Sequence, residues 1–186
     1  MAFLAADSRP AHAHGDGRHW LLPDVVSTQT AGYIGYVAGG IGYLSFDRLW
    51  ESTLFYGYVP REVGGIEIHT ISWKNNLYFV HFMFADLCEI TPLYLGLTIL
   101  FAMDRNVHWQ YSTDCPRWYY PPTGAHAAVN IGVQMLVRGG LLDLTHGFYA
   151  ELSMLDTYLK AYVWDDSDHL ALNDCATLAI GYKILF

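Results

Sequence analysis

The end of the chain alternates strictly between two kinds of side chain. Every second position from residue 178 onward is apolar or aromatic: Leu178, Ile180, Tyr182, Ile184 and Phe186. The positions between and just before them are small or polar: Thr177, Ala179, Gly181 and Lys183. Successive side chains of a strand point to opposite faces of its sheet. An apolar outer face and a small or polar inner face are typical of a barrel immersed in lipid, so this pattern predicts a lipid-facing row that ends at Phe186.

The same rule recurs in two segments far from the end of the chain. Residues 93–101 place Leu, Ile or Phe at every second position, with Tyr94, Gly96 and Thr98 among those between them. Residues 129–137 place Val, Ile or Met at every second position, with Asn130 and Gln134 among those between them. Three separate segments therefore obey one alternation, which indicates strands of a lipid-immersed sheet more strongly than any local motif does.

The other strands are predicted from weaker signals. Residues 32–46 and 50–59 are expected to be the first two, since each glycine in 32–46 would cost about 1 kcal/mol relative to Ala in a helix. Residues 66–73 and 77–84 flank Lys74, Asn75 and Asn76, which favour a hairpin turn because Asn tolerates positive φ. In the latter strand Tyr78 is expected to point outward and His81 inward. Residues 147–164 are interpreted as one long strand.

These elements predict an all-β fold, a single antiparallel up-and-down transmembrane β-barrel of eight strands. The count becomes ten if the chain breaks near residues 155–157, where residues 148–162 also fit helical spacing. No nonpolar stretch is long enough for a transmembrane helix, which needs about 20 residues, because His81, Asp86, Glu89 and Pro92 interrupt the apolar residues 77–103.

The alternating strand that ends in Phe186 resembles the closing strand of bacterial outer-membrane β-barrels. Residues 56–60 and 64–69 resemble segments of uncharacterised barrels of that class. The resemblance implies a Gram-negative outer membrane, contact with membrane lipid, and recognition of Phe186 by the assembly machinery. It also implies that residues 31–186 form the barrel and that residues 104–126 lie on the extracellular side. Residues 1–30 are then a leader remnant or an irregular periplasmic arm, with cleavage expected near His14, after the small-x-small triplet at 11–13.

Composition excludes some partners and sites. The net charge is −8 and the 10 Lys and Arg residues form no cluster, so we expect no nucleic-acid partner. The three cysteines show no metal-binding spacing and are interpreted as unpaired thiols: Cys88, Cys115 and Cys175. The polar clusters at His12, His14, Asp16 and His19 and at Asp165, Asp166 and Asp168 are interpreted as solvated segments. We therefore expect no metal and no cofactor.

The interior of an eight-stranded barrel is just wide enough to be filled by side chains. The residues expected to form a polar lumen network are Glu151, Lys183, Gln134, Asn130 and His81. Because an unpaired charge in such a lumen would be costly, Glu151 and Lys183 are predicted to belong to a buried network of ion pairs. A gated polar pathway is the functional alternative.

The predicted function is a structural or surface-interaction role in the outer membrane, with no specific activity. One alternative is a lipid-modifying enzyme, an acyl-chain hydrolase or transferase, with His146, Glu151 and Ser153 as weak catalytic candidates. Another is a soluble lipocalin-like binder, which would need the faces assigned above to be reversed. Four aromatic residues of the long loop suit either an interaction surface or a belt at headgroup level: Trp109, Trp118, Tyr119 and Tyr120. The ligand and the oligomeric state are not assigned.

Overall fold

The computed structural model of the protein describes residues 21–85, 87–103, 124–139, 144–159 and 175–186. The described secondary structure is almost entirely strand. The strands are β1 (Val25–Ala31), β2 (Val37–Ser45), β3 (Trp50–Val59), β4 (Ile68–Tyr78), β5 (Phe82–Phe84), β6 (Cys88–Met103), β7 (Ala125–Arg138), β8 (Thr145–Leu155) and β9 (Ala176–Leu185). One helical turn, α1 (Arg61–Gly64), links β3 to β4. No helix in the described ranges is long and apolar enough to span a membrane.

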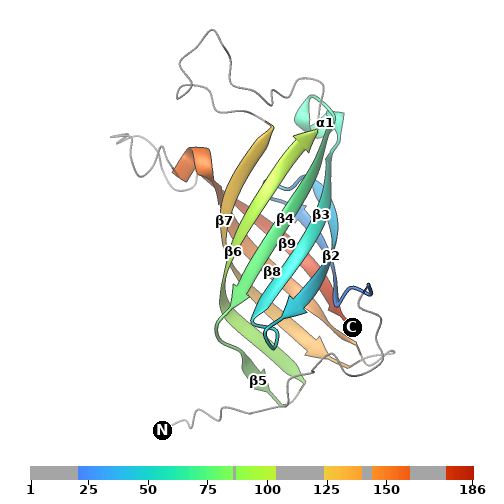
Figure 1. Ribbon diagram of the computed structural model, residues 1–186, viewed down its shortest axis with the longest axis vertical. Helices are drawn as coiled ribbons and strands as arrows, with labels where there is room; N and C mark the ends of the chain where they lie inside the picture. Colours follow the sequence, from blue (N-terminus) through green and yellow to red (C-terminus); the bar gives the residue numbers. More distant parts are fainter. Residues whose placement is uncertain (1–20, 86, 104–123, 140–143, 160–174) are drawn as a thin grey trace.

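The sheet closes on itself (Figure 1). Each strand pairs antiparallel with its neighbours, and the circle is completed by β1 with β9 and by β4 with β6. β5 pairs with β6 and adds a short hairpin arm to one edge of the eight-stranded barrel. The prediction of an all-β antiparallel barrel with eight strands is confirmed, and the ten-stranded alternative is wrong.

The two ends of the barrel differ. The terminal end carries Asp24 and Phe186, where the Phe186 backbone N–H donates to the Asp24 carbonyl oxygen at 3.0 Å. It also carries the β2–β3 turn at residues 46–49 and the β5 arm. The loop end carries α1, the β1–β2 turn, the end of β6 and the start of β7. In Figure 1 the β5 arm and the C-terminus lie toward the bottom and α1 lies at the top.

The predicted turn at Lys74, Asn75 and Asn76 is wrong, because these residues lie inside β4. Lys74 and Asn76 are buried in the lumen, and Asn75 on the outer face accepts a hydrogen bond from the Trp50 indole at 3.2 Å. Tertiary partners therefore override the local turn preference of the two asparagines. Tyr78 consequently points inward, where it is 2% exposed, and not outward as predicted.

The predicted first strand at residues 32–46 is correct only over residues 37–45, which form β2, because a turn lies before them and β1 precedes it. Ala31, Gly32 and Gly35 have positive φ angles of 61°, 80° and 154°, which end β1 and start β2. At Gly35 an added Cβ would lie 2.9 Å from the Tyr58 backbone nitrogen, so the turn needs glycine there. β1 begins at Val25, so the barrel starts before residue 31, where the sequence analysis placed its boundary.

The long strand predicted at residues 147–164 is half correct. β8 ends at Leu155 and residues 156–159 are helical, while residues 160–164 lie outside the described ranges. Within the described part of this stretch, the helical spacing applies only to residues 156–159.

A bulge in β6 sets the alternation of the segment that follows it. The register between β6 and β7 shifts between Thr91 and Tyr94, which are both buried, while Pro92 and Leu93 are exposed. Proline has no backbone N–H for a regular ladder, so it is tolerated at a bulge. Before the bulge the odd-numbered residues Glu89 and Thr91 face inward. After it the even-numbered residues face inward, so the apolar row that starts at Leu93 faces outward.

Candidate functional site: the charged lumen and the apolar outer wall

The barrel has apolar side chains on its outer face and polar side chains in its lumen, the reverse of a water-soluble barrel. The predicted terminal row lies on the outer side of β9, where Leu178, Ile180 and Phe186 are about half exposed and Tyr182 and Ile184 are half-buried. The alternate positions Ala179 and Lys183 are 0% and 2% exposed. The same arrangement holds on β7, whose outward row is exposed from Val129 to Met135 while Asn130 and Gln134 are buried.

Glu151 and Lys74 form the first ion pair of the lumen. The Lys74 Nζ lies 2.5 Å from Glu151 Oε1 and donates a second hydrogen bond to Gln29 Oε1 at 2.7 Å. The Tyr94 hydroxyl donates to the other carboxylate oxygen of Glu151 at 3.0 Å. Both charged side chains are at most 2% exposed. Four strands, β1, β4, β6 and β8, thus meet at this pair.

Lys183 and Glu51 form the second ion pair. The Lys183 Nζ donates to Glu51 Oε2 at 2.7 Å and contacts the Tyr78 hydroxyl at 2.9 Å. Glu51 also accepts hydrogen bonds from Tyr78 at 2.9 Å and from Thr53 at 3.2 Å. This pair connects β9 to β3 and β4 across the lumen.

Tyr149 lies between the two pairs. The centroid of its ring is 5.5 Å from Lys74 Nζ and 5.1 Å from Lys183 Nζ. Its hydroxyl donates to Gln29 Oε1 at 3.1 Å. A ring face attracts a cation most strongly where water is excluded. The two ion pairs contain two lysines and two glutamates, so their charges balance. The ring of Tyr149 lies near both ammonium groups and separates them.

A third polar cluster closes the terminal end. Arg48 of the β2–β3 turn makes two hydrogen bonds to the Glu89 carboxylate, at 3.0 and 3.2 Å. The His81 Nδ1 lies 3.0 Å from Glu89 Oε1 and 3.0 Å from the Thr91 hydroxyl. Gln134 donates to the same hydroxyl at 3.1 Å. A small cavity separates this cluster from the Lys183–Glu51 pair.

The five residues predicted for the lumen network are thus distributed over the length of the barrel. Glu151 and Lys183 belong to different ion pairs, whereas buried Gln134 and exposed His81 both contact the Thr91 hydroxyl at the terminal end. Asn130 is buried and donates to the Thr98 hydroxyl at 2.6 Å, on the side of the loop end. Near that mouth the His126 Nδ1 also lies 3.4 Å from Asp156 Oδ1.

One charged partner in each pair was not predicted from the sequence. Glu51 was not among the predicted lumen residues, although Glu51 and Thr53 alternate with the outward residues Trp50, Ser52 and Leu54. Lys74 was predicted to lie in a turn. The three lumen tyrosines, Tyr78, Tyr94 and Tyr149, were not predicted to belong to the network. Alternation would have pointed to Glu51, but nothing local marks Lys74 as buried.

The weak catalytic candidates are not brought together. Glu151 and Ser153 point into the lumen, where Glu151 is bound to Lys74. His146 has the opposite phase on β8 and lies 2.9 Å, from its Nδ1, from the hydroxyl of Tyr182 in the outward row. His146 and Glu151 are five positions apart on the strand, about 16 Å at about 3.3 Å per residue. A nucleophile needs its base within hydrogen-bonding reach, and this arrangement does not supply one.

In the part of the chain that the structure describes, no three His, Cys, Asp or Glu side chains gather as a metal site would require. Cys88 and Cys175 are free thiols. Several sequence expectations concern residues outside the described ranges: the leader and its cleavage near His14, the polar groups at His12, Asp16 and His19, the loop aromatics Trp109, Trp118, Tyr119 and Tyr120, Cys115, and the aspartates Asp165, Asp166 and Asp168.

The outer face of β3 and β4 carries hydrogen-bonded aromatic residues along its length. Toward the terminal end, the Trp50 and Trp73 indoles donate to Asn75 Oδ1 and Ser52 Oγ. Toward the loop end, the Tyr56 hydroxyl bonds His69 and the Tyr58 hydroxyl donates to Glu67. In the sheet register Trp73 lies opposite Leu54 and Tyr56 lies opposite Ile71, near the middle of these strands, whereas Trp50 and Tyr58 lie near the two ends of β3.

Comparison of the chain with protein-family models, with curated proteins and with solved structures found no match.

Proposed function

We propose that the protein is a transmembrane β-barrel of the bacterial outer membrane, with a sealed lumen and a structural or surface-interaction role. The observation that carries this proposal is the placement of two Lys–Glu pairs inside a closed sheet whose outer wall is apolar. Hydrocarbon solvates such an outer wall, whereas water would not. A closed barrel also leaves no unpaired strand edge in the bilayer.

The extent of the apolar surface supports a lipid environment. Among the described residues 36 large hydrophobic side chains are exposed, and 21 of them lie on the barrel strands, on every strand except β1. Soluble monomers rarely expose a contiguous apolar patch larger than a few hundred Å². A wall of this kind in water would drive aggregation, so its solvent is the acyl chains of a membrane.

The height of the outer wall and its aromatic residues agree with this proposal. The outward row of β7 from Val129 to Val137 covers about 26 Å along the strand at about 3.3 Å per residue. A strand tilt of about 40° reduces this height to about 20 Å, near the apolar band of about 25 Å in outer-membrane barrels. Trp50 and Tyr58, near the two ends of the outward row of β3, have hydrogen-bonded polar atoms, as is typical of aromatic residues at the two membrane–water interfaces.

The filled lumen argues against a channel. Eight strands enclose a space that side chains can fill, and here Lys74, Glu151, Lys183 and Glu51 occupy it together with three tyrosines. A soluble lipocalin-like binder would require an apolar interior with room for a ligand, which disagrees with this charged core. The enzyme alternative has no described residues in catalytic geometry to support it. The terminal Phe186, about half exposed beside the last rung of the sheet, remains the proposed signal for the assembly machinery.

The test is membrane association of the native chain. Cells that express the full chain are fractionated, and the membranes are washed in alkaline carbonate and floated on a density gradient. We expect the protein to float with outer-membrane lipid, to need detergent for extraction, and to migrate differently on gels with and without heating. In planar bilayers of phosphatidylethanolamine and phosphatidylglycerol we expect no steady conductance. Recovery as a monodisperse protein in detergent-free buffer would overturn the proposal.

A further inference from the structure

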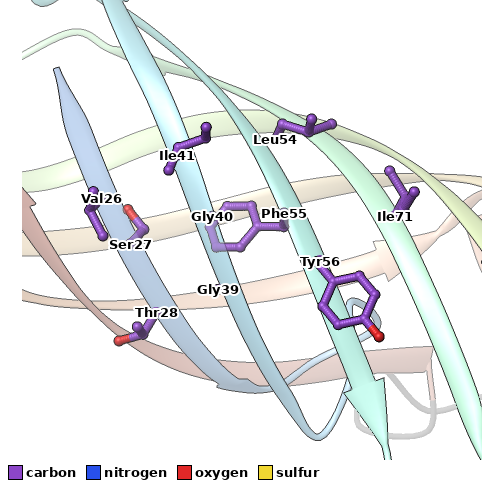
Figure 2. Close-up of a pocket in the computed structure, with 10 residues that line it drawn as sticks. All are labelled: Val26, Ser27, Thr28, Gly39, Gly40, Ile41, Leu54, Phe55, Tyr56 and Ile71. Atoms are coloured by element: carbon purple, nitrogen blue, oxygen red, sulfur yellow. The ribbon is translucent and has the colours of Figure 1, made fainter. Parts of the chain in front are cut away.

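The outer wall is hollowed over β1, β2 and β3 (Figure 2). At the bottom of this hollow is Gly39, whose outward side is open: a Cβ added there would meet no atom within 4 Å. The walls are side chains of the surrounding strands: Val26, Thr28, Ile41, Leu54, Tyr56 and Ile71. The volume is about 410 Å³, within the range of about 300–1,000 Å³ for small-molecule sites. We call this site the Gly39 groove.

Two adjacent glycines produce the groove. Gly40 points inward, and the ring of Phe55 fills the space where its side chain would be, 2.8 Å from the position of an added Cβ. Gly39 points outward and lies between Thr28 on β1 and Tyr56 on β3 in the sheet register. At this place the inner face of the sheet is therefore filled by Phe55, while the outer face is recessed at Gly39.

The walls of the groove are held in position before any ligand arrives. The Tyr56 hydroxyl lies 2.6 Å from His69 Nδ1, which fixes the phenol ring. Val26, Ile41 and Ile71 are β-branched and have few rotamers. Because little side-chain freedom remains to be lost, binding in the groove carries a small entropic cost.

We propose that the Gly39 groove holds one acyl chain of a membrane lipid in a fixed position. No charged side chain lines the groove, and its walls continue the apolar outer wall on both sides. Its ten lining residues are too few for a stable contact with a second copy, which takes about 20–30 residues from each partner. This inference rests on the proposed membrane function, since it specifies one lipid contact within that wall.

The test uses the full chain in vesicles of phosphatidylethanolamine and phosphatidylglycerol that contain a phosphatidylcholine with a diazirine in one acyl chain. After illumination and proteolysis, mass spectrometry locates the labelled residues. We expect labelling in the groove to exceed that on the opposite wall, at Leu95, Leu97, Ile131 and Val133, by about fivefold. This ratio corresponds to about 1 kcal/mol of preference.

Two variants make the test specific. Gly39→Leu fills the groove in open space and should reduce its labelling to that of the opposite wall. Ala150→Leu adds the same bulk on the outer face of β8 and should leave the enrichment unchanged. Equal labelling of both walls in the unaltered protein overturns the groove and leaves the membrane function standing. A protein that stays in the aqueous phase without label overturns both. A dimer that Gly39→Leu dissociates would assign the groove to a second copy and overturn the lipid.

Discussion

Glu151 and Leu152 are neighbours on β8, yet Glu151 faces the lumen and is 1% exposed, whereas Leu152 faces outward and is 49% exposed. Glu151 is held by two particular groups, the Lys74 ammonium and the Tyr94 hydroxyl, which come from two other strands. Leu152 lies opposite Leu178 and Ile131 in the sheet register, within an outer wall of similar side chains. The inner wall therefore depends on individual partners, whereas the outer wall depends on a class of side chain and on its solvent.

This difference predicts how each wall tolerates change. On the inner wall, removing one member of a pair leaves a buried charge that the rest of the lumen cannot solvate. On the outer wall, one apolar side chain can replace another with little effect, but a charge cannot be introduced. The free energy of unfolding of the protein in lipid vesicles measures both kinds of tolerance.

The largest effect is expected for Glu151→Ala. Among its described partners, Lys74 then keeps only the side-chain amide oxygen of Gln29 as a close acceptor. Its buried ammonium therefore has no negative charge paired with it. We expect a loss of about 3 to 5 kcal/mol of unfolding free energy, measured by guanidinium titration of the protein in vesicles. The matched outer-wall control, Leu152→Ile, should change stability by no more than about 0.5 kcal/mol.

The double variant Lys74→Met with Glu151→Leu separates pairing from packing. Because both charges are removed together, it should recover most of the stability that Glu151→Ala loses. If the double variant is as unstable as the single one, the shape of these side chains and not their charge holds the lumen.

The next largest effect is expected for Val133→Arg, at the centre of the outward row of β7. A guanidinium near the bilayer midplane should cost about 2 to 4 kcal/mol in vesicles, whereas Val133→Ile should be nearly neutral. The measurement is the same titration, with assembly yield as a second readout. A soluble barrel would give the opposite result, because Val133→Arg would then improve solubility without loss of stability.

Glycine on the two walls gives a smaller and sharper contrast. At Gly181 an added Cβ would lie 2.1 Å from a ring atom of Tyr149, so Gly181→Ala must displace the ring that separates the two lysines. We expect a loss of about 1 to 3 kcal/mol from this overpacking. Gly39→Ala, on the open outer wall, should leave stability unchanged or raise it by up to about 1 kcal/mol. Equal costs at the two positions would contradict the assignment of the faces.

The sequence predicted best those strands whose two walls differ strongly. In β9 and β7 most outward residues are large and apolar, and the inward residues are small or polar except Leu136 and Leu185, so alternation assigns the faces. β1 was missed because Ser27 and Gln29 alternate with Val26, Thr28 and Thr30, which is a weak contrast. The strand count of eight was correct although two segments were misassigned, because the division of β4 into two predicted strands offset the omission of β1.

The alternation of side chains predicted which charged residues of the candidate site face the lumen, but not which of them form pairs. Lys183 and Glu151 could be placed inside by phase, but their partners could not be paired. Lys74 and Glu151 are 77 residues apart in the chain, and their contact depends on closure of the barrel between β4 and β6. An asparagine pair next to a lysine favours a turn locally, and only this distant carboxylate makes it a strand. The missing information was thus nonlocal pairing, which residue type and spacing do not encode.

The smallest effect is expected for Tyr149→Phe, which tests whether the ring or the hydroxyl joins the two ion pairs. The hydroxyl donates to Gln29 Oε1, but that oxygen also accepts from Lys74 Nζ, so its loss leaves no orphaned acceptor and should cost about 1 kcal/mol. The ring of Phe would still lie near both ammonium groups. Tyr149→Leu removes this ring and should cost more, since a desolvated cation–ring contact contributes about 2 kcal/mol. If Phe and Leu are equally costly in vesicle titrations, the hydroxyl and not the ring connects the pairs, and the lumen then depends on hydrogen bonds alone at its centre.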